Sequence, residues 1–331
     1  MHGRRRSQAL VAGLASVLVL IVWTVAPADG AALPEGRLPV SFSTVSAALA
    51  GSTRPGAPPP GANDWSCRPQ ADRPRPVVLV HGLGTNMTGN WDTISPLLAN
   101  EGYCVFALTY GVTPGARFPL DQLGGMVPME SSAQELANFV DQVRTGTGAS
   151  EVDLVAQSEG TLVVQQYLKF GGGASAVDHF VALTPLYQGT SVSALDRLRD
   201  VGSASLALLF PLFADTVDQL CGSCQQFLAG SDFLRRLNAD GVIAEGVSYT
   251  NIVTRYDQLV VPFTSGLVDG PGVANHVVQD DCALDLSDHL AMAFDPVAAR
   301  HVLNALDPAH AVAPVCTLVL AGIGGPSAAT T

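Results

Sequence analysis

The sequence predicts one large α/β domain with a doubly wound, mostly parallel sheet and a helical insertion between two of its strands. Apolar runs without polar alternation recur along the chain, as expected of strands covered on both faces. Amphipathic runs separate them, and strands that alternate with helices favour parallel pairing. The strand-like runs cover 76–80, 103–108, 152–156, 180–183 and 249–253.

The expected helices follow from apolar spacing and stop signals between these runs. Residues 131–144 are the clearest case, because their apolar residues recur on a single helical face. Residues 91–100 and 161–170 are also expected to be helical, and three consecutive glycines end the second of them.

The chain opens on a segment typical of an export signal. Three arginines precede an apolar run over 9–26, and small residues follow at 28–32, the pattern that signal peptidase cleaves. The run is nearly long enough to span a bilayer, so a membrane anchor is the alternative. No basic stop-transfer cluster follows the run. We therefore expect a signal peptide over 1–32 and a secreted protein.

Composition divides the remaining chain into three parts. Residues 33–76 are rich in Pro and Gly and are expected to form an extended lead-in. The α/β domain is expected over 77–316, and residues 317–331 form a C-terminal tail.

The helical insertion is expected over about 189–246, between the fourth and fifth predicted strands. Insertions of this length usually form a cap or a substrate wall. The alternative is a pair of helices packed on the sheet edge. A stretch without charge, 203–213, predicts that part of the insertion lines the substrate pocket. Its candidate substrate-binding residues are Leu206, Leu209, Phe210 and Phe213.

Charge and cysteine content restrict the class of protein. The formal net charge of −12 disfavours nucleic acid and anionic membranes as partners. Six cysteines, an even number, fit an oxidising compartment. Sequence alone leaves their pairing open. Placement along the chain suggests pairs between Cys67 and Cys104, Cys221 and Cys224, and Cys282 and Cys316.

Ser158 is the candidate nucleophile. The segment Ala156-Gln157-Ser158-Glu159-Gly160 lies between a predicted strand and a predicted helix. This is the setting of the nucleophile elbow of α/β-hydrolases, in which a sharp turn raises the serine above the sheet. Ala156 replaces the more usual glycine, which the turn tolerates. The alternative is an ordinary serine N-cap.

A glycine-bracketed loop, Val80-His81-Gly82-Leu83-Gly84, follows the first predicted strand. In α/β-hydrolases the oxyanion hole combines a backbone N–H of such a loop with the N–H that follows the nucleophile. We assign these donors to Leu83 and Glu159. His81 precedes the serine in the chain, so we expect it to have a structural role in the loop.

The acid and base should follow the serine in the order Ser, acid, His. Asp257 ends the strand that starts near residue 249, at the sheet edge where such folds place their sites. Asp269, Asp280 and Asp281 compete with it from loops. His289 lies in a loop before a helical stretch, from which an imidazole can reach the serine. The other histidines after the serine are His276, in a short strand and kept as the reserve base, His301 and His310.

Signals for cofactor chemistry are missing from the sequence. It has no His-Glu-x-x-His, no phosphate-binding Gly-Lys loop and no dinucleotide fingerprint. The Cys-x-x-Cys motif lacks a second ligand pair for zinc and a thioredoxin-like context, which favours a disulfide. We therefore expect no cofactor and no catalytic metal, while a structural calcium stays open.

Several of these motifs together resemble the secreted bacterial triacylglycerol lipase and esterase family called lipase class 2, and more distantly the fungal lipase B type. The resemblance covers about 65–308 and includes 76–82, 102–106, 156–160, 249–252, 254–257 and 260–262, with Asn275, Gln279 and Cys282. It implies an α/β-hydrolase that cleaves carboxylic esters, with Ser158, Asp257 and His289 at the triad positions. It also implies the oxyanion donors and the three disulfides named above. His276 departs from the apolar strand residue expected at its position.

Our interpretation is a secreted serine hydrolase, a triacylglycerol lipase or carboxylesterase that acts through an acyl-enzyme. Acyl transfer to an alcohol or polyester hydrolysis can use the same triad. A catalytically silent hydrolase fold that serves as a binding protein is the alternative from another class. The sequence does not predict acyl chain length or oligomeric state.

Overall fold

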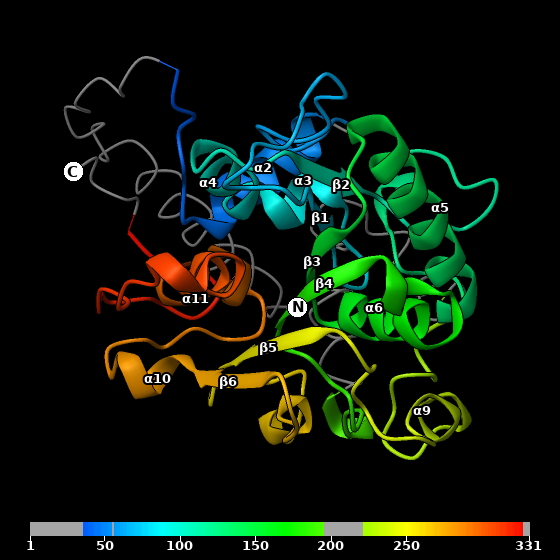
Figure 1. Ribbon diagram of the computed structural model, residues 1–331. Helices are drawn as coiled ribbons and strands as arrows, with labels where there is room; N and C mark the ends of the chain where they lie inside the picture. Colours follow the sequence, from blue (N-terminus) through cyan, green and yellow to red (C-terminus); the bar gives the residue numbers. More distant parts are fainter. Residues whose placement is uncertain (1–35, 55, 195–220, 327–331) are drawn as a thin grey trace, which may run out of the picture. The chain divides into compact units, whose positions relative to one another are not determined.

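The computed structural model describes residues 36–54, 56–194 and 221–326 (Figure 1). The chain divides into two compact units, one of Met1–Arg37 with Thr330–Thr331 and one of Leu38–Ala329. The sheet and its helices belong to the second unit. The signal peptide expected over 1–32 lies outside the described residues, as do Leu206, Leu209, Phe210 and Phe213. Among the described residues, no helix is both long and apolar enough to cross a bilayer.

Six parallel strands form one sheet in the order β2-β1-β3-β4-β5-β6. Every residue of the first three strands is buried, which explains why their sequences lack polar alternation. The parallel sheet with flanking helices confirms the predicted α/β-hydrolase class. The strands are β1 Val77–Val80, β2 Val105–Leu108, β3 Val152–Gln157, β4 Val177–Leu183, β5 Ser248–Val253 and β6 Val273–Val277.

Helices cover both faces of the sheet (Figure 1). Val78 and Val80 of β1 belong to one hydrophobic cluster with α5, α6 and α9, while Val77 and Leu79 belong to another with α4 and α11. Successive residues of a strand point to opposite faces, so both sides of β1 are packed. The helices are α2 Thr44–Thr53, α3 Met87–Trp91, α4 Ile94–Asn100, α5 Met129–Thr147, α6 Glu159–Phe170, α9 Asp232–Leu237, α10 Val278–Asp281 and α11 Pro296–Leu306. Short 3-10 turns are η1 Leu120–Gln122, η2 Gly173–Ser175, η3 Phe263–Gly266, η4 Ala291–Phe294 and η5 Pro308–His310.

Two segments differ from the sequence-based expectation, and a third agrees with its alternative. The helix expected over 91–100 is two helices, α3 and α4, because α3 ends at Trp91. The lead-in expected to be extended contains α2, an alanine-rich stretch whose start is capped by the Ser43 hydroxyl. In the insertion, Phe233, Leu234 and Leu237 of α9 are buried in the cluster that includes α6. The described end of the insertion therefore packs as an ordinary helix.

The sheet order creates a topological switch between β1 and β3. The chain passes from β1 to β2 on one side and then returns to place β3 on the other side of β1. Ligands of open α/β sheets bind at such a point, beyond the carboxyl ends of the strands. The loop after β1 and the turn after β3 therefore meet at one site.

All six cysteines are paired, as Cys67–Cys104, Cys221–Cys224 and Cys282–Cys316. The first joins the segment before β1 to the start of β2, and the third joins the end of α10 to the C-terminal segment.

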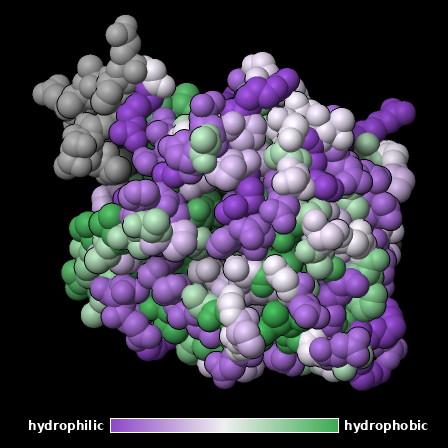
Figure 2. Space-filling model, in the orientation of Figure 1, coloured by the Kyte–Doolittle hydropathy of each residue, from purple (hydrophilic) through white to green (hydrophobic). Residues whose placement is uncertain are grey.

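Figure 2 shows a face on which hydrophilic and hydrophobic side chains are interspersed.

Candidate active site

Ser158 lies in a sharp turn between β3 and α6, with φ 54° and ψ −128°. Few non-glycine residues adopt a positive φ, and such strained positions cluster at functional sites. The turn also requires glycine at 160, because a Cβ there would lie 2.4 Å from the carbonyl oxygen of His81. Gly82 also lies close to the serine, because a Cβ at that position would be 3.2 Å from Cβ of Ser158. These two glycines allow the loop after β1 to approach the serine.

The side chains of Ser158, His289 and Asp257 form one hydrogen-bonded chain. Nε2 of His289 lies 2.8 Å from Oγ of Ser158, and its Nδ1 lies 2.8 Å from Oδ2 of Asp257. A carboxylate only accepts hydrogen bonds, so Nδ1 carries the proton and Nε2 is free to accept from the serine hydroxyl. Nε2 is thus placed to remove the hydroxyl proton.

Backbone and amide groups hold the acid and the base in place. Oδ1 of Asp257 accepts hydrogen bonds from the backbone N–H groups of Leu259, at 2.9 Å, and Val260, at 2.7 Å. The side chain of Gln258 accepts from the backbone N–H of His289 at 3.1 Å. The side chains of Asp257 and His289 are 2% and 4% exposed, so water competes little for these bonds.

Two backbone N–H groups border the cavity at the serine. Leu83 follows the Gly82 turn and Glu159 opens α6, and both residues line the cavity that contains Ser158. Within the ranges that the structure describes, neither N–H donates a hydrogen bond. Hydrogen bonds between Gly84 N–H and the Gly124 carbonyl, and between Gly124 N–H and the Thr85 carbonyl, each 2.8 Å, hold the loop. The arrangement is suited to an oxyanion hole.

His81 is buried and braces this loop. Its ring stacks on Tyr110 with centroids 4.3 Å apart, and its Nε2 accepts from the Tyr110 backbone N–H at 3.2 Å. Nδ1 therefore carries the proton and donates to the Gly82 carbonyl at 2.7 Å. Burial lowers the pKa of His81 to about 4, so the ring is neutral at physiological pH. Both ring nitrogens bind backbone atoms.

The Glu159 carboxyl is buried beside the hydroxyl groups of Ser223 and Tyr110. Its Oε2 lies 3.0 Å from the Ser223 hydroxyl, whose single proton has a closer acceptor in the Gly125 carbonyl at 2.7 Å. Tyr110, the other polar side chain beside the carboxyl, donates its proton to the His81 carbonyl at 2.8 Å. A protonated Glu159 can donate to Ser223 instead. Burial raises the pKa of Glu159 well above its ordinary value.

A cavity of about 280 Å³ opens at Ser158 and His289. Its described lining is mainly apolar beyond the polar groups of the triad and the oxyanion loop. Sequence reasoning missed these apolar residues, although one of them directly follows His289 and two others lie two and three residues after Asp257. They are Leu186, Phe227, Leu259, Val260, Leu290 and Phe294.

The competing acids and bases have other partners. Asp280 pairs with Arg255, and His310 pairs with Asp307. Asp281 pairs with His301, whose ring stacks on His276. Among the described residues, these side chains make no hydrogen bond to Ser158, His289 or Asp257.

Comparison with known proteins adds independent evidence. The model of a family described as lipase (class 2) matches residues 74–301, more than half of the chain. The chain belongs to the lipase class 2 family.

One solved structure shows the same fold at low sequence identity, and a second gives a weaker match. A crystal structure of Aspergillus fumigatus lipase B matches with a TM-score of 0.54 and 19% identity, covering 77% of this chain and 61% of that chain. The mature form of Bacillus licheniformis lipase BlEst2 matches with a TM-score of 0.47 and 15% identity, covering 72% of this chain and 91% of that chain. The lipase class 2 protein thus spans 61% of the length of the fungal lipase B that it matches.

Proposed function

We propose that this lipase class 2 protein is a secreted serine hydrolase in which Ser158, His289 and Asp257 form the catalytic triad. The observation that carries the proposal is the continuous chain of hydrogen bonds from the Ser158 hydroxyl through His289 to Asp257. A metal-independent acyl transfer needs this set of nucleophile, base and orienting acid.

Catalysis proceeds in two half-reactions. Nε2 of His289 takes the hydroxyl proton as Oγ of Ser158 attacks the ester carbonyl carbon, and the backbone N–H groups of Leu83 and Glu159 stabilise the resulting oxyanion. The intermediate expels the alcohol, which takes the proton from His289, and leaves an acyl-serine. Water then gives a proton to His289 and attacks the acyl carbon, which releases the carboxylic acid and restores the serine. Losing one oxyanion donor costs about 3–4 kcal/mol in related enzymes.

The apolar cavity lining supports an ester with an apolar acyl group, as in lipases and carboxylesterases. Leu186, Phe227 and Leu290 offer carbon surface beside the nucleophile. We further propose that Leu206, Leu209, Phe210 and Phe213 complete this surface. A net charge of −12 and three disulfides support a secreted protein that needs no nucleic acid and no lasting membrane anchor.

A fluorophosphonate probe tests the triad directly. It should label the native protein, and the label should disappear in Ser158→Ala. Ser131→Ala, at an exposed serine of α5, is the matched control and should keep the label. A folded native protein without labelling, or labelling that survives Ser158→Ala, would overturn the proposal.

Substrate profiling separates the two ester classes. Hydrolysis should be measured on a graded series of p-nitrophenyl esters and on emulsified triglycerides. Higher activity on emulsions would identify a lipase, and higher activity on soluble short esters would identify an esterase. Activity on neither class would contradict the proposed substrate.

A further inference from the structure

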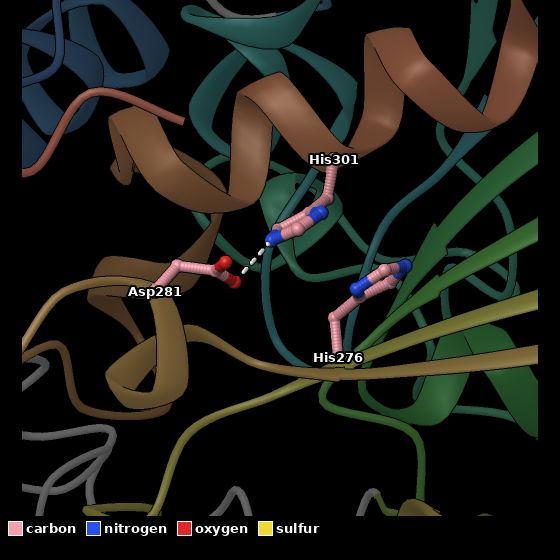
Figure 3. Close-up of side chains that lie close together, drawn as sticks. All are labelled: His276, Asp281 and His301. Carbon is pink, nitrogen blue, oxygen red and sulfur yellow. Dashed lines mark hydrogen bonds and ion pairs between the residues drawn. The ribbon is translucent and has the colours of Figure 1, made fainter. Parts of the chain in front are cut away.

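A second cluster of ligand-type side chains, distinct from the triad, lies where β6, α10 and α11 meet (Figure 3). His276 extends from β6, Asp281 ends α10, and His301 extends from α11. Nε2 of His301 lies 2.9 Å from Oδ2 of Asp281, and the two imidazole rings stack with centroids 4.0 Å apart. Figure 3 shows both rings on the same side of Asp281. We propose that His276, Asp281 and His301 bind a divalent cation of the zinc type.

The donor set fits such a cation. Two imidazoles with one carboxylate are typical of zinc sites, in which three protein ligands leave a position for water. Calcium and magnesium prefer oxygen ligands, so this set disfavours them.

The distances require only a small adjustment. The three potential ligand atoms all lie within 4.8 Å of one another. Tetrahedral coordination with bonds of about 2.0–2.2 Å places ligand atoms about 3.3 Å apart. The ion would enter between His301 and Asp281, replace their hydrogen bond and draw the His276 ring inward. Asp281 has a side chain that is 37% exposed, which leaves a route from solvent.

The surrounding structure fixes two of the ligands. His301 has a side chain that is 6% exposed within α11, and Asp281 directly precedes the Cys282–Cys316 disulfide. In the described part of the chain, Asp281 forms an ion pair with His301 alone. No arginine or lysine there neutralises the cluster, so a cation would find an available carboxylate.

A second cluster in the chain provides the contrast. Asp153, Asp178 and His179 also lie within ligand distance of one another. The guanidinium of Arg75 already binds Asp153 at 2.8 Å and Asp178 at 2.9 Å. Both carboxylates of this cluster are therefore already bound by a guanidinium, and the cluster serves as an internal control.

Zinc binding to the purified, untagged protein tests the proposal. After dialysis against micromolar Zn²⁺, metal content should approach one ion per chain, and Co²⁺ should give the visible absorption of a tetrahedral site. His276→Phe preserves ring stacking and Asp281→Asn preserves side-chain size. Each variant should weaken zinc binding by about 10- to 100-fold or more. Loss of a residue that merely hydrogen-bonds a metal ligand already has an effect of this size. The matched variants His179→Phe and Asp178→Asn should bind as the wild type does.

Thermal unfolding gives a readout independent of hydrolysis. Zn²⁺ should raise the Tm of the wild type, and a chelator should reverse the rise, because a ligand that binds only the folded state stabilises it. In His276→Phe and Asp281→Asn, neither Zn²⁺ nor the chelator should change the Tm. Both substitutions are at partly exposed side chains. The proposal would be overturned if the wild type bound no zinc. It would also be overturned if His276→Phe and Asp281→Asn bound zinc as tightly as the wild type does.

Discussion

The side-chain amide of Gln157 donates a hydrogen bond to the backbone carbonyl of His289 at 3.0 Å. Oε1 of the same amide accepts from Asn90 at 2.7 Å, and Asn90 in turn accepts from the backbone N–H of Gly82 at 3.3 Å. The residue before the nucleophile thus connects the loop of the base to the loop of the proposed oxyanion hole. Gln157 and Asn90 are both buried, so the geometry of the site depends on this network.

We expect Gln157→Leu to lower kcat by about 10- to 100-fold with a smaller effect on KM, because displacement of a reacting group by about 1 Å has this effect. The change also leaves the His289 carbonyl unpaired, which should cost about 1–3 kcal/mol of unfolding free energy. Steady-state kinetics and denaturant unfolding measure the two effects. Gln165→Leu, at a buried glutamine of α6 that bonds Tyr249, is the matched control and should change stability alone.

Asp257→Asn should lower kcat by about 10⁴-fold while the protein stays folded. An asparagine can turn its amide donor toward Nδ1 of His289, which would then hold the wrong tautomer. Asp280→Asn, at a surface carboxylate that pairs with Arg255, is the control and should leave kcat unchanged. Comparable losses in both variants would contradict the assignment of Asp257.

The raised pKa of the Glu159 carboxyl predicts a pH-dependent difference between the wild type and Glu159→Gln. The pKa of Glu159 is raised above its ordinary 4.5 in the folded state, so its contribution to stability is complete below pH 4.5 and decreases as pH rises toward the folded pKa. Glutamine mimics the protonated acid and does not titrate. The Tm of Glu159→Gln relative to wild type should therefore increase as pH rises above 4.5.

The activity of the wild type should also fall relative to that of Glu159→Gln as pH rises, because an ionised Glu159 would place a negative charge beside the proposed oxyanion site. The wild type should lose kcat at alkaline pH before Glu159→Gln does. Glu130→Gln, at an exposed glutamate paired with Arg236, is the matched control and should follow the wild type. Identical pH profiles for all three proteins would show that Glu159 is ionised in the folded enzyme.

Sequence reasoning recovered the sheet because buried parallel strands such as Val77–Val80 have no polar residues to obscure them. It also selected Ser158, Asp257 and His289, which the structure brings together, because α/β-hydrolases fix the chain order of these groups. Phe227 and the cluster around His276 gave no comparable signal. Their neighbours come from distant loops and helices, and the contacts arise only from tertiary packing.

The cavity wall at Phe227 offers a test of acyl selectivity. Phe227 is 3% exposed and lines the cavity beside the triad, so Phe227→Leu should enlarge the space available to an acyl chain. One added or missing methylene in an apolar pocket changes specificity by about 10- to 200-fold. We expect kcat/KM for longer p-nitrophenyl esters to rise at least about 10-fold relative to the acetate. Phe233→Leu, at an equally buried residue of α9 outside the described cavity lining, controls for lost packing. Both variants lose a similar volume of buried side chain. A change in chain-length preference in Phe227→Leu alone would show that Phe227 contacts the acyl chain. An unchanged preference in Phe227→Leu would contradict that contact.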